Sequence, residues 1–204
     1  MKRKTIGIVD YGVGNHLSVL RAFQSLGHRC RVSSDREILE SADVLVLPGV
    51  GAFPTAMAAL HQHKLVDFLG YLAQQGMPII GLCLGMQLLA DKSLEHGTTS
   101  GLGLIPGTVR PLQGLKWHIG WNSLESVKQD ELLTPSDGES FYFNHSYVFD
   151  VQADCQAAVS HERDSSFTVA VRRGNVVGLQ FHPEKSQAAG RLLLSRLVEG
   201  LDHA

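Results

Sequence analysis

The chain has 204 residues, of which 44% are hydrophobic and 19% charged, and its formal net charge at pH 7 is -2. This length supports one well-buried core, so we expect a single domain over residues 1–204. The nearly balanced charge provides no field for a polyanion and argues against nucleic acid as a partner. The first apolar run, residues 5–9, ends at Asp10, too soon for a signal peptide or a membrane span.

The sequence contains three cysteines, Cys30, Cys83 and Cys155, an odd number at wide spacings. This pattern fits neither a disulfide framework nor a tetrahedral zinc site. We therefore expect a cytoplasmic protein that needs no metal and no other cofactor.

The first elements alternate between short apolar runs and longer helical patterns. The runs 6–9, 44–47 and 78–82 are expected to be strands, and the stretches 17–26 and 53–72 helices. Strands that are apolar at nearly every residue suit a parallel sheet covered on both faces. The predicted fold class is α/β, with a doubly wound, mostly parallel open sheet.

The helical pattern disappears between residues 101 and 180. Apolar pieces at 141–143, 167–171 and 176–180 are expected to form mixed or antiparallel strands that complete the sheet. A last helix is expected to start near Ser186, a favourable N-cap residue. It would direct four leucines to the core: Leu192, Leu193, Leu194 and Leu197.

A candidate nucleophile lies in the segment 81–85, Gly-Leu-Cys-Leu-Gly, between a strand and a helical run. Glycines on both sides of Cys83 permit the sharp strand-to-helix turn that presents a nucleophile above a sheet. The following helix N-terminus favours the thiolate, which is the reactive form. From this motif alone, a buried structural cysteine in a tight turn is an equally good interpretation.

A candidate base and its orienting carboxylate follow the last predicted strand, in the segment 180–184, Gln-Phe-His-Pro-Glu. His182 is expected at a strand end, where active groups of open α/β sheets collect. Residues two apart in an extended segment share a face, so Glu184 is expected beside His182. Alone, this segment also suits a loop histidine and a solvated glutamate; together with Cys83 it predicts a Cys-His-Glu triad.

The segments 81–87 and 181–184, with the order Cys, His, Glu, resemble the class I (triad-type) glutamine amidotransferases. Three further segments narrow the resemblance to the glutaminase subunits of imidazole glycerol phosphate synthases: 10–15 (Asp-Tyr-Gly-Val-Gly-Asn), 48–53 (Pro-Gly-Val-Gly-Ala-Phe) and 118–122 (His-Ile-Gly-Trp-Asn). The resemblance covers nearly the whole chain.

The resemblance implies that the substrate is glutamine, which the Cys83 thiolate attacks while His182 transfers protons. The oxyanion donors would be the backbone amide of Leu84 and one from the loop that contains Gly49, Val50 and Gly51. A plain βα turn is the other interpretation of that loop. In this family a peptide flip there is proposed to switch hydrolysis on.

The same resemblance assigns the amino-acid end of the substrate to four residues. Gln87 lies one helical turn beyond the nucleophile, and Glu95 follows that helix. Backbone amides of Ser146 and Tyr147 would bind the glutamine carboxylate. Without the resemblance, Glu95 would be interpreted as a surface charge and Tyr147 as a strand aromatic.

The resemblance further implies a heterodimer with a (β/α)8-barrel cyclase subunit, which consumes the ammonia. The overall reaction would form imidazole glycerol phosphate and an aminoimidazole carboxamide ribotide for histidine biosynthesis. The implied contacts with the cyclase are Asn15, His118, Trp121, Asn122 and Lys185.

Four residues depart from the family pattern: His16, Trp117, Ile119 and Asn144. They border the expected partner surface and bear on docking, not on the triad. Two other hypotheses stay open: a glutaminase subunit that serves a different synthase, and a catalytically silent module that regulates a partner.

Overall fold

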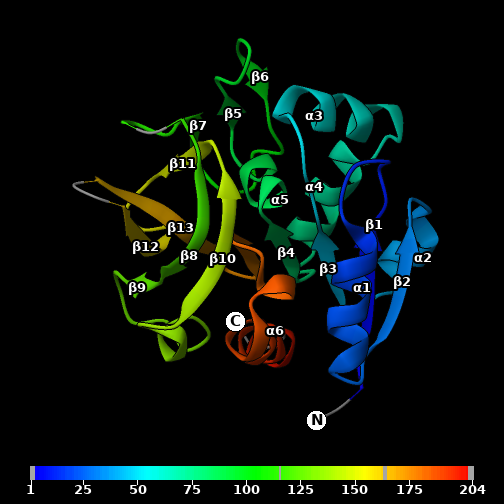
Figure 1. The fold of residues 1–204 in the computed structure, drawn as a ribbon. Helices are drawn as coiled ribbons and strands as arrows, with labels where there is room; N and C mark the ends of the chain where they lie inside the picture. Colours follow the sequence, from blue (N-terminus) through cyan, green and yellow to red (C-terminus); the bar gives the residue numbers. More distant parts are fainter. Residues whose placement is uncertain (1–2, 115, 163–164, 202–204) are drawn as a thin grey trace.

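The computed structural model describes residues 3–114, 116–162 and 165–201. Its centre is a mixed sheet with the strand order β2-β1-β3-β4-β14-β13-β12-β9 (Figure 1). The first five strands in this order are parallel, and the last three pair antiparallel. The strands are β2 (Arg29–Ser33), β1 (Thr5–Val9), β3 (Val44–Leu47), β4 (Ile79–Leu82), β14 (Val176–Leu179), β13 (Ser165–Arg173), β12 (Gln156–Glu162) and β9 (Glu125–Ser126).

Helices cover both faces of the parallel half. One face packs against α1 (His16–Ser25) and α6 (Gln187–Gly200). The other packs against α2 (Arg36–Glu40), α3 (Phe53–Gln62), α4 (Val66–Gln74) and α5 (Leu84–Leu88). In β3, Val44 and Val46 belong to the first core, whereas Leu45 and Leu47 belong to the second. This alternation explains why the whole strand is apolar.

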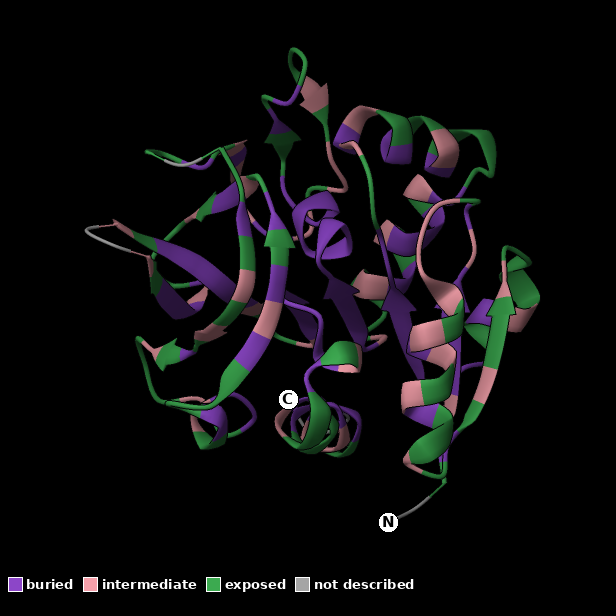
Figure 2. Cartoon of the chain, in the orientation of Figure 1, coloured by how far each residue is buried: buried purple, intermediate pink, exposed green. Residues whose placement is uncertain are grey.

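Two smaller sheets stand beside the main one. The first pairs β10 (Ser140–His145) antiparallel with β8 (His118–Ser123). The second has the order β11-β7-β5-β6, formed by β11 (Tyr147–Val151), β7 (Gly107–Pro111), β5 (Lys92–Ser93) and β6 (Thr99–Ser100). Two 3-10 helices, η1 (Thr134–Ser136) and η2 (Pro183–Lys185), complete the described elements. In Figure 2 the inner strands β1, β3 and β4 and helix α5 are almost wholly buried, whereas the edge strand β2 carries exposed and intermediate residues.

The α/β class and the doubly wound, mostly parallel sheet agree with the sequence prediction. Three details differ. The predicted strand at residues 141–143 lies in the separate β10-β8 sheet, because strand partners depend on distant segments. The stretch 53–72 is two helices, separated where Lys64 adopts a φ of 55°. Strand β2 and helix α2 were not predicted, because their exposed edge position weakens their apolar pattern.

The expectations for the last helix were partly wrong. Ser186 precedes α6, but its hydroxyl makes no cap bond; it donates to the carbonyl of His182 and accepts from the amide of Tyr142. Leu192 is 63% exposed, whereas the other three leucines are buried. Among the described residues, no helix has the length and apolar character needed to cross a membrane.

Candidate active site

Cys83 lies at the turn between β4 and α5, with the strained backbone expected of a nucleophile at such a turn. Its φ is 54° and its ψ is -110°, a conformation that side-chain-bearing residues rarely adopt. Two flanking glycines allow it. A Cβ on Gly85 would lie 1.8 Å from the carbonyl oxygen of Leu47, and one on Gly81 would lie 2.6 Å from that of Gly85. Close packing of backbone against backbone thus requires these glycines.

His182 and Glu184 form the predicted pair, with Nδ1 of the imidazole 2.8 Å from Oε1 of the carboxylate. Both side chains are buried, at 5% and 2% exposure. The expected geometry was wrong, however. Residues Pro183–Lys185 form η2, so a tight 3-10 turn, and not an extended strand, brings the carboxylate to the ring. Because the carboxylate accepts at Nδ1, the Nε2 atom is left for proton transfer.

The surroundings of His182 favour the imidazolium form. Burial lowers its pKa, but hydrogen bonds with Cys83 and Glu184 and the charges of both residues outweigh burial and raise the pKa from 6.5 to about 9. The structure therefore brings the three members of the predicted triad together.

Two neighbours complete the surroundings of the nucleophile. The thiol of Cys83 donates to the carbonyl of Asn144 over 3.7 Å, and the amide of Gln180 donates to the sulfur over 3.8 Å. Gln180 is fully buried, and its Oε1 accepts from Nε2 of Gln87 at 2.9 Å. Sequence reasoning missed Gln180 as a site residue, although a polar residue at the end of an apolar strand was a usable signal.

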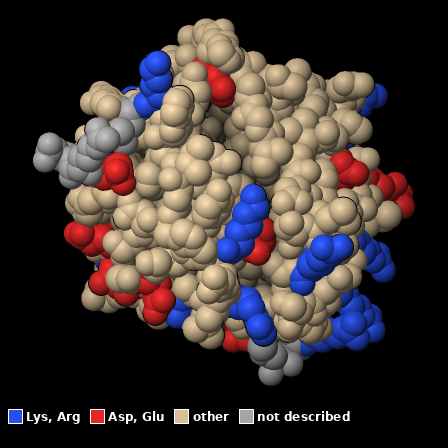
Figure 3. Space-filling model, in the orientation of Figure 1, with Lys and Arg blue, Asp and Glu red and all other residues tan. Residues whose placement is uncertain are grey.

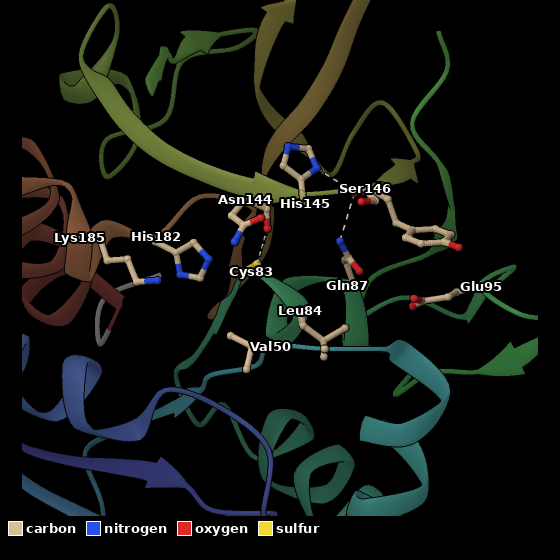
Figure 4. A pocket seen from close by; sticks show the side chains of 12 residues that line it. Val50, Cys83, Leu84, Gln87, Glu95, Asn144, His145, Ser146, His182 and Lys185 are labelled. Atoms are coloured by element: carbon tan, nitrogen blue, oxygen red, sulfur yellow. Dashed lines mark hydrogen bonds between the residues drawn. The ribbon is translucent and has the colours of Figure 1, made fainter. Parts of the chain in front are cut away.

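A cavity of about 260 Å³ opens in front of Cys83. Figure 4 shows Cys83 with His182 on one side and Gln87 and Glu95 on the other, and the His145 ring on the side of β10 that faces away from Cys83. The lining residues are Val50, Gly51, Cys83, Leu84, Gln87, Glu95, Asn144, His145, Ser146, Tyr147, His182 and Lys185. All four predicted glutamine-binding residues thus line the same cavity as the nucleophile.

Hydrogen bonds hold two of the predicted glutamine-binding side chains, those of Gln87 and Glu95, in place. Nε2 of Gln87 donates to the carbonyl of Tyr147 at 3.2 Å. Glu95 is only 7% exposed, and its Oε2 accepts from the amide of Phe53 at 2.7 Å. That bond fixes one carboxylate oxygen, while the other, Oε1, lies 4.0 Å from Nε2 of the exposed His96 and can accept from a cationic group.

The predicted oxyanion residues lie on both sides of the turn. Leu84 is the first residue of α5, where an amide has no partner within the helix. Val50 and Gly51 line the cavity, whereas Gly49 lies behind it: a Cβ there would meet the hydroxyl of Tyr11 at 2.8 Å and Cβ of Leu84 at 2.9 Å. The Gly49 loop is therefore packed directly against the nucleophile turn.

The predicted partner residues do not all lie at the surface. Trp121 is 51% exposed, and Lys185 lines the cavity with its Nζ 5.8 Å from the ring centre of Tyr142. Asn15 caps α1 by accepting from the amide of Ser18. His118 and the half-buried Asn122 are considered below, because His118 is only 6% exposed and points inward.

Two more residues beside the site were not singled out from the sequence. Tyr11 is buried, and its hydroxyl donates to the carbonyl of Pro48 at 2.6 Å. His145 is 6% exposed and lines the cavity. Tyr11 lies in the segment 10–15 that carried the family resemblance, but its partner Pro48 is distant in the chain. His145 precedes the predicted residues Ser146 and Tyr147, and its ring also meets His118, 27 positions away. Among the described residues, no group of three or more His, Cys, Asp or Glu side chains is arranged to hold a metal ion.

A cysteine at a strained strand-to-helix turn, beside an imidazole that a carboxylate orients, defines the site of a cysteine-dependent triad enzyme. A family model described as "Glutamine amidotransferase class-I" matches residues 7–197.

Similar proteins narrow the family. The chain is 42% identical over 196 residues to the imidazole glycerol phosphate synthase subunit HisH of Streptococcus sanguinis, covering 94% of each chain. It is 43% identical over 206 residues to HisH of Shouchella clausii, covering 96% of this chain and 99% of the relative. The chain therefore belongs to the class I glutamine amidotransferases and, within them, to the HisH subunits of imidazole glycerol phosphate synthase.

Solved structures support the fold. The structure titled "Structure of PurLQS from Thermotoga maritima" superposes with a TM-score of 0.78 at 19% identity, covering 98% of this chain and 100% of that one. At such low identity the likeness shows the fold alone.

Proposed function

We propose that this chain hydrolyses glutamine to glutamate and ammonia and supplies the ammonia to a cyclase subunit. In this proposal Cys83 is the nucleophile, His182 the acid and base, and Glu184 the orienting group. The observation that carries the proposal is the buried 2.8 Å contact between His182 and Glu184, directly beside Cys83 at its strained turn.

The reaction follows from the protonation of these groups. The Cys83 thiolate attacks the carboxamide carbon, and the resulting oxyanion is bound by the amide of Leu84 and by an amide of the Val50–Gly51 peptide region. His182 gives its proton to the nitrogen, the C–N bond breaks, and ammonia leaves a glutamyl thioester. His182 then takes a proton from water, hydroxide attacks the thioester, and the thiolate departs from glutamate.

The cavity supports glutamine as the substrate. The amino group of glutamine would meet Oε1 of Glu95. The substrate carboxylate would meet the amides of Ser146 and Tyr147, with Gln87 alongside. Glu95 and Cys83 lie at different ends of the cavity (Figure 4). A glutamine whose amino group is bound at Glu95 would therefore extend its carboxamide towards the sulfur of Cys83. A buried carboxylate with an oxygen that can still accept is a strong partner for an ammonium group.

An exposed apolar surface supports docking of a (β/α)8-barrel cyclase as the heterodimer partner. Trp117, Ile119 and Trp121 are 61%, 58% and 51% exposed around β8, and Leu17 is 64% exposed on α1. Figure 3 shows few charged side chains over β8 and β10, with most charges towards the edge. Exposed aromatic clusters of this kind mark protein interfaces. Asn15, Asn122 and Lys185 would lie at or near this contact.

The cyclase would use the ammonia on a phosphoribulosyl-formimino carboxamide nucleotide. The products would be imidazole glycerol phosphate and an aminoimidazole carboxamide ribotide, formed in the cytoplasm during histidine biosynthesis. Free ammonia becomes ammonium near neutral pH, and ammonium is no nucleophile, so passage between docked subunits protects it. The chain would act as one domain over its full length; residues 1–2 and 202–204 lie outside the described part.

Replacing the nucleophile tests the proposal. In the complex with the cyclase, Cys83→Ala should abolish glutamine-dependent product formation, while ammonium salt still supports it. Cys30→Ala, at a half-buried cysteine far from the cavity, is the matched control and should keep both activities. Loss of both activities in Cys83→Ala would indicate damage to folding or docking, and retained glutamine use would refute the nucleophile.

Pairing with the cyclase separates this proposal from the two alternatives. Glutamine hydrolysis should rise when the cyclase and its nucleotide ligand are added. Hydrolysis that never rises would favour a different synthase partner, and the absence of any hydrolysis would favour a silent regulatory module.

A further inference from the structure

Two histidines that are not part of the triad, His118 and His145, lie buried beside the cavity. His118 begins β8 and His145 ends β10, directly opposite each other in the antiparallel register. Each is 6% exposed. Their rings meet edge to face with centroids 5.1 Å apart, flanked by Phe143 and Phe167. Buried polar rings in an apolar setting require hydrogen-bond partners, which define their protonation.

One carbonyl fixes the direction of the hydrogen bonds through both rings. Nδ1 of His145 lies 2.9 Å from the carbonyl oxygen of Tyr147, which only accepts, so Nδ1 carries the hydrogen. In the neutral ring, Nε2 then accepts, and its partner is Nδ1 of His118 at 3.0 Å. Nε2 of His118 is left as an acceptor, and it faces Nδ2 of Asn122 at 3.4 Å.

The amide of Asn122 is oriented independently of the rings. Its Nδ2 donates to the carbonyl of His161 at 2.7 Å, and its Oδ1 accepts from the amide of Ser123 at 2.8 Å. Nδ2 therefore faces His118, as the ring hydrogen bonds require. Each hydrogen bond of the series is therefore donated towards Tyr147: Asn122 donates to His118, His118 to His145, and His145 to the carbonyl of Tyr147.

Burial supports the neutral rings. It lowers the pKa of His145 to about 4, although the hydrogen bond to the Tyr147 carbonyl opposes it, and nearby His118 and His182 lower the pKa further. Burial also lowers the pKa of His118, with Glu162 opposing; the Oε2 of Glu162 lies 3.8 Å from Nε2 of His118. Neutral rings are the form that such a chain of hydrogen bonds needs.

The hydrogen-bond series ends at Tyr147, which lies at the site. The carbonyl of Tyr147 also accepts from Gln87, and the carbonyl of Asn144 accepts from the thiol of Cys83. Residues 144–147 thus contact both the nucleophile and the helix that follows it. Resting on the proposed glutaminase function, we propose that His118 and His145 are positioning residues, whose hydrogen bonds hold residues 144–147 so that the amides of Ser146 and Tyr147 meet the glutamine carboxylate.

Two substitutions at one position separate hydrogen bonding from packing. In His118→Asn the side-chain Nδ2 occupies the place of the imidazole Nδ1 and still donates to His145. In His118→Leu the buried Nε2 of His145 loses its donor, at the cost of an unpaired polar atom. The complex with the cyclase and its nucleotide ligand is used, and glutamine hydrolysis is measured over a range of glutamine concentrations.

The expected result is a change in KM more than in kcat. His118→Leu should raise the KM for glutamine by about tenfold with kcat within about threefold, and His118→Asn should restore most of the KM, since the lost interaction concerns substrate binding. An unchanged KM in His118→Leu would overturn the proposal. Equal losses in both variants would do the same, because packing alone would then explain them.

A spectroscopic measurement tests the hydrogen bonds without any variant. The ring-nitrogen chemical shifts of the unmodified chain at neutral pH should show Nδ1 protonated and Nε2 bare in both histidines. A proton on Nε2 of His145, or a charged ring, would overturn the proposed chain. If the unmodified chain failed to hydrolyse glutamine with its partner, the proposed function would fall, and this measurement would still decide the hydrogen-bond direction.

Discussion

The hydroxyl of Tyr11 donates a 2.6 Å hydrogen bond to the carbonyl of Pro48, and so ties the end of β1 to the loop that carries the predicted oxyanion donors. Tyr11 is 1% exposed, and burial, followed by the charge of Cys83, raises its pKa well above the usual range. The hydroxyl is therefore a permanent donor. It restrains the loop from outside the cavity, which Tyr11 does not line.

Removing this hydroxyl should loosen the loop. Tyr11→Phe is expected to lower kcat for glutamine hydrolysis by about fivefold with a smaller effect on KM, because one lost neutral hydrogen bond costs about 1 kcal/mol. Steady-state hydrolysis in the complex checks this. Tyr71→Phe, at a residue 51% exposed on α4, is the matched control and should leave both constants unchanged. An unaltered kcat in Tyr11→Phe would mean that the loop is held by other contacts.

The protonation of His182 should depend on Cys83. The folded-state pKa of about 9 lies above the ordinary 6.5, so the stabilisation from the imidazolium is complete below pH 6.5 and is lost as the pH rises through 9. Because Cys83 is one cause of the increase, Cys83→Ala should lower the midpoint. An NMR titration of the His182 ring in both proteins measures the shift.

The activity should follow the same ionisation. If the imidazolium protonates the carboxamide nitrogen as the C–N bond breaks, kcat/KM for hydrolysis should decline above about pH 9. A midpoint of His182 that stays the same in Cys83→Ala would show that the thiol does not act on the ring.

Glu184 should act through its charge. Glu184→Gln keeps an oxygen for Nδ1 of His182 but removes the carboxylate, so the pKa of His182 falls and kcat/KM should drop by about a hundredfold. The measurement is hydrolysis in the complex, with Glu37→Gln on the exposed side of α2 as the control. A decrease below about twofold would contradict the orienting role, since such partners typically contribute more.

Glu95 should act on substrate binding. In Glu95→Gln the amide oxygen can still accept from Phe53, so the local fold is kept while the charge for the substrate ammonium is lost. The KM for glutamine should rise by about tenfold or more, with a smaller change in kcat, because a buried charge pair is broken. Steady-state hydrolysis checks the change against Glu40→Gln, an exposed residue of α2. An unchanged KM would place the amino group elsewhere.

The sequence was sufficient for the parts of the site that are local in the chain. The turn at Cys83 follows from two glycines between a strand and a helix, and the pairing of His182 with Glu184 was expected. Even so, the pairing was inferred from an extended segment, whereas a 3-10 turn produces it. Glu184 was correctly predicted to lie beside His182, although the predicted backbone was wrong. The fixed φ of Pro183 suits both an extended segment and a 3-10 turn.

Residues whose partners are distant could not be assigned from the sequence. Tyr11 meets Pro48 across 37 positions, and His118 meets His145 across 27. Ser186 was expected to cap a helix, yet its hydroxyl joins Tyr142 of β10 to His182 of the triad. The contact of His118 with His145 depends on the register of β8 against β10, and that of Tyr11 with Pro48 on the pairing of β1 with β3. Composition and periodicity determine neither.

The backbone at Cys83 also has a consequence for the stability of the whole chain. A φ of 54° with a ψ of -110° costs about 1–3 kcal/mol for a residue with a side chain and little for glycine. Cys83→Gly should therefore unfold at a higher temperature than Cys83→Ala. The position best suited to the reaction is thus one where folding alone would favour a residue with no side chain at all.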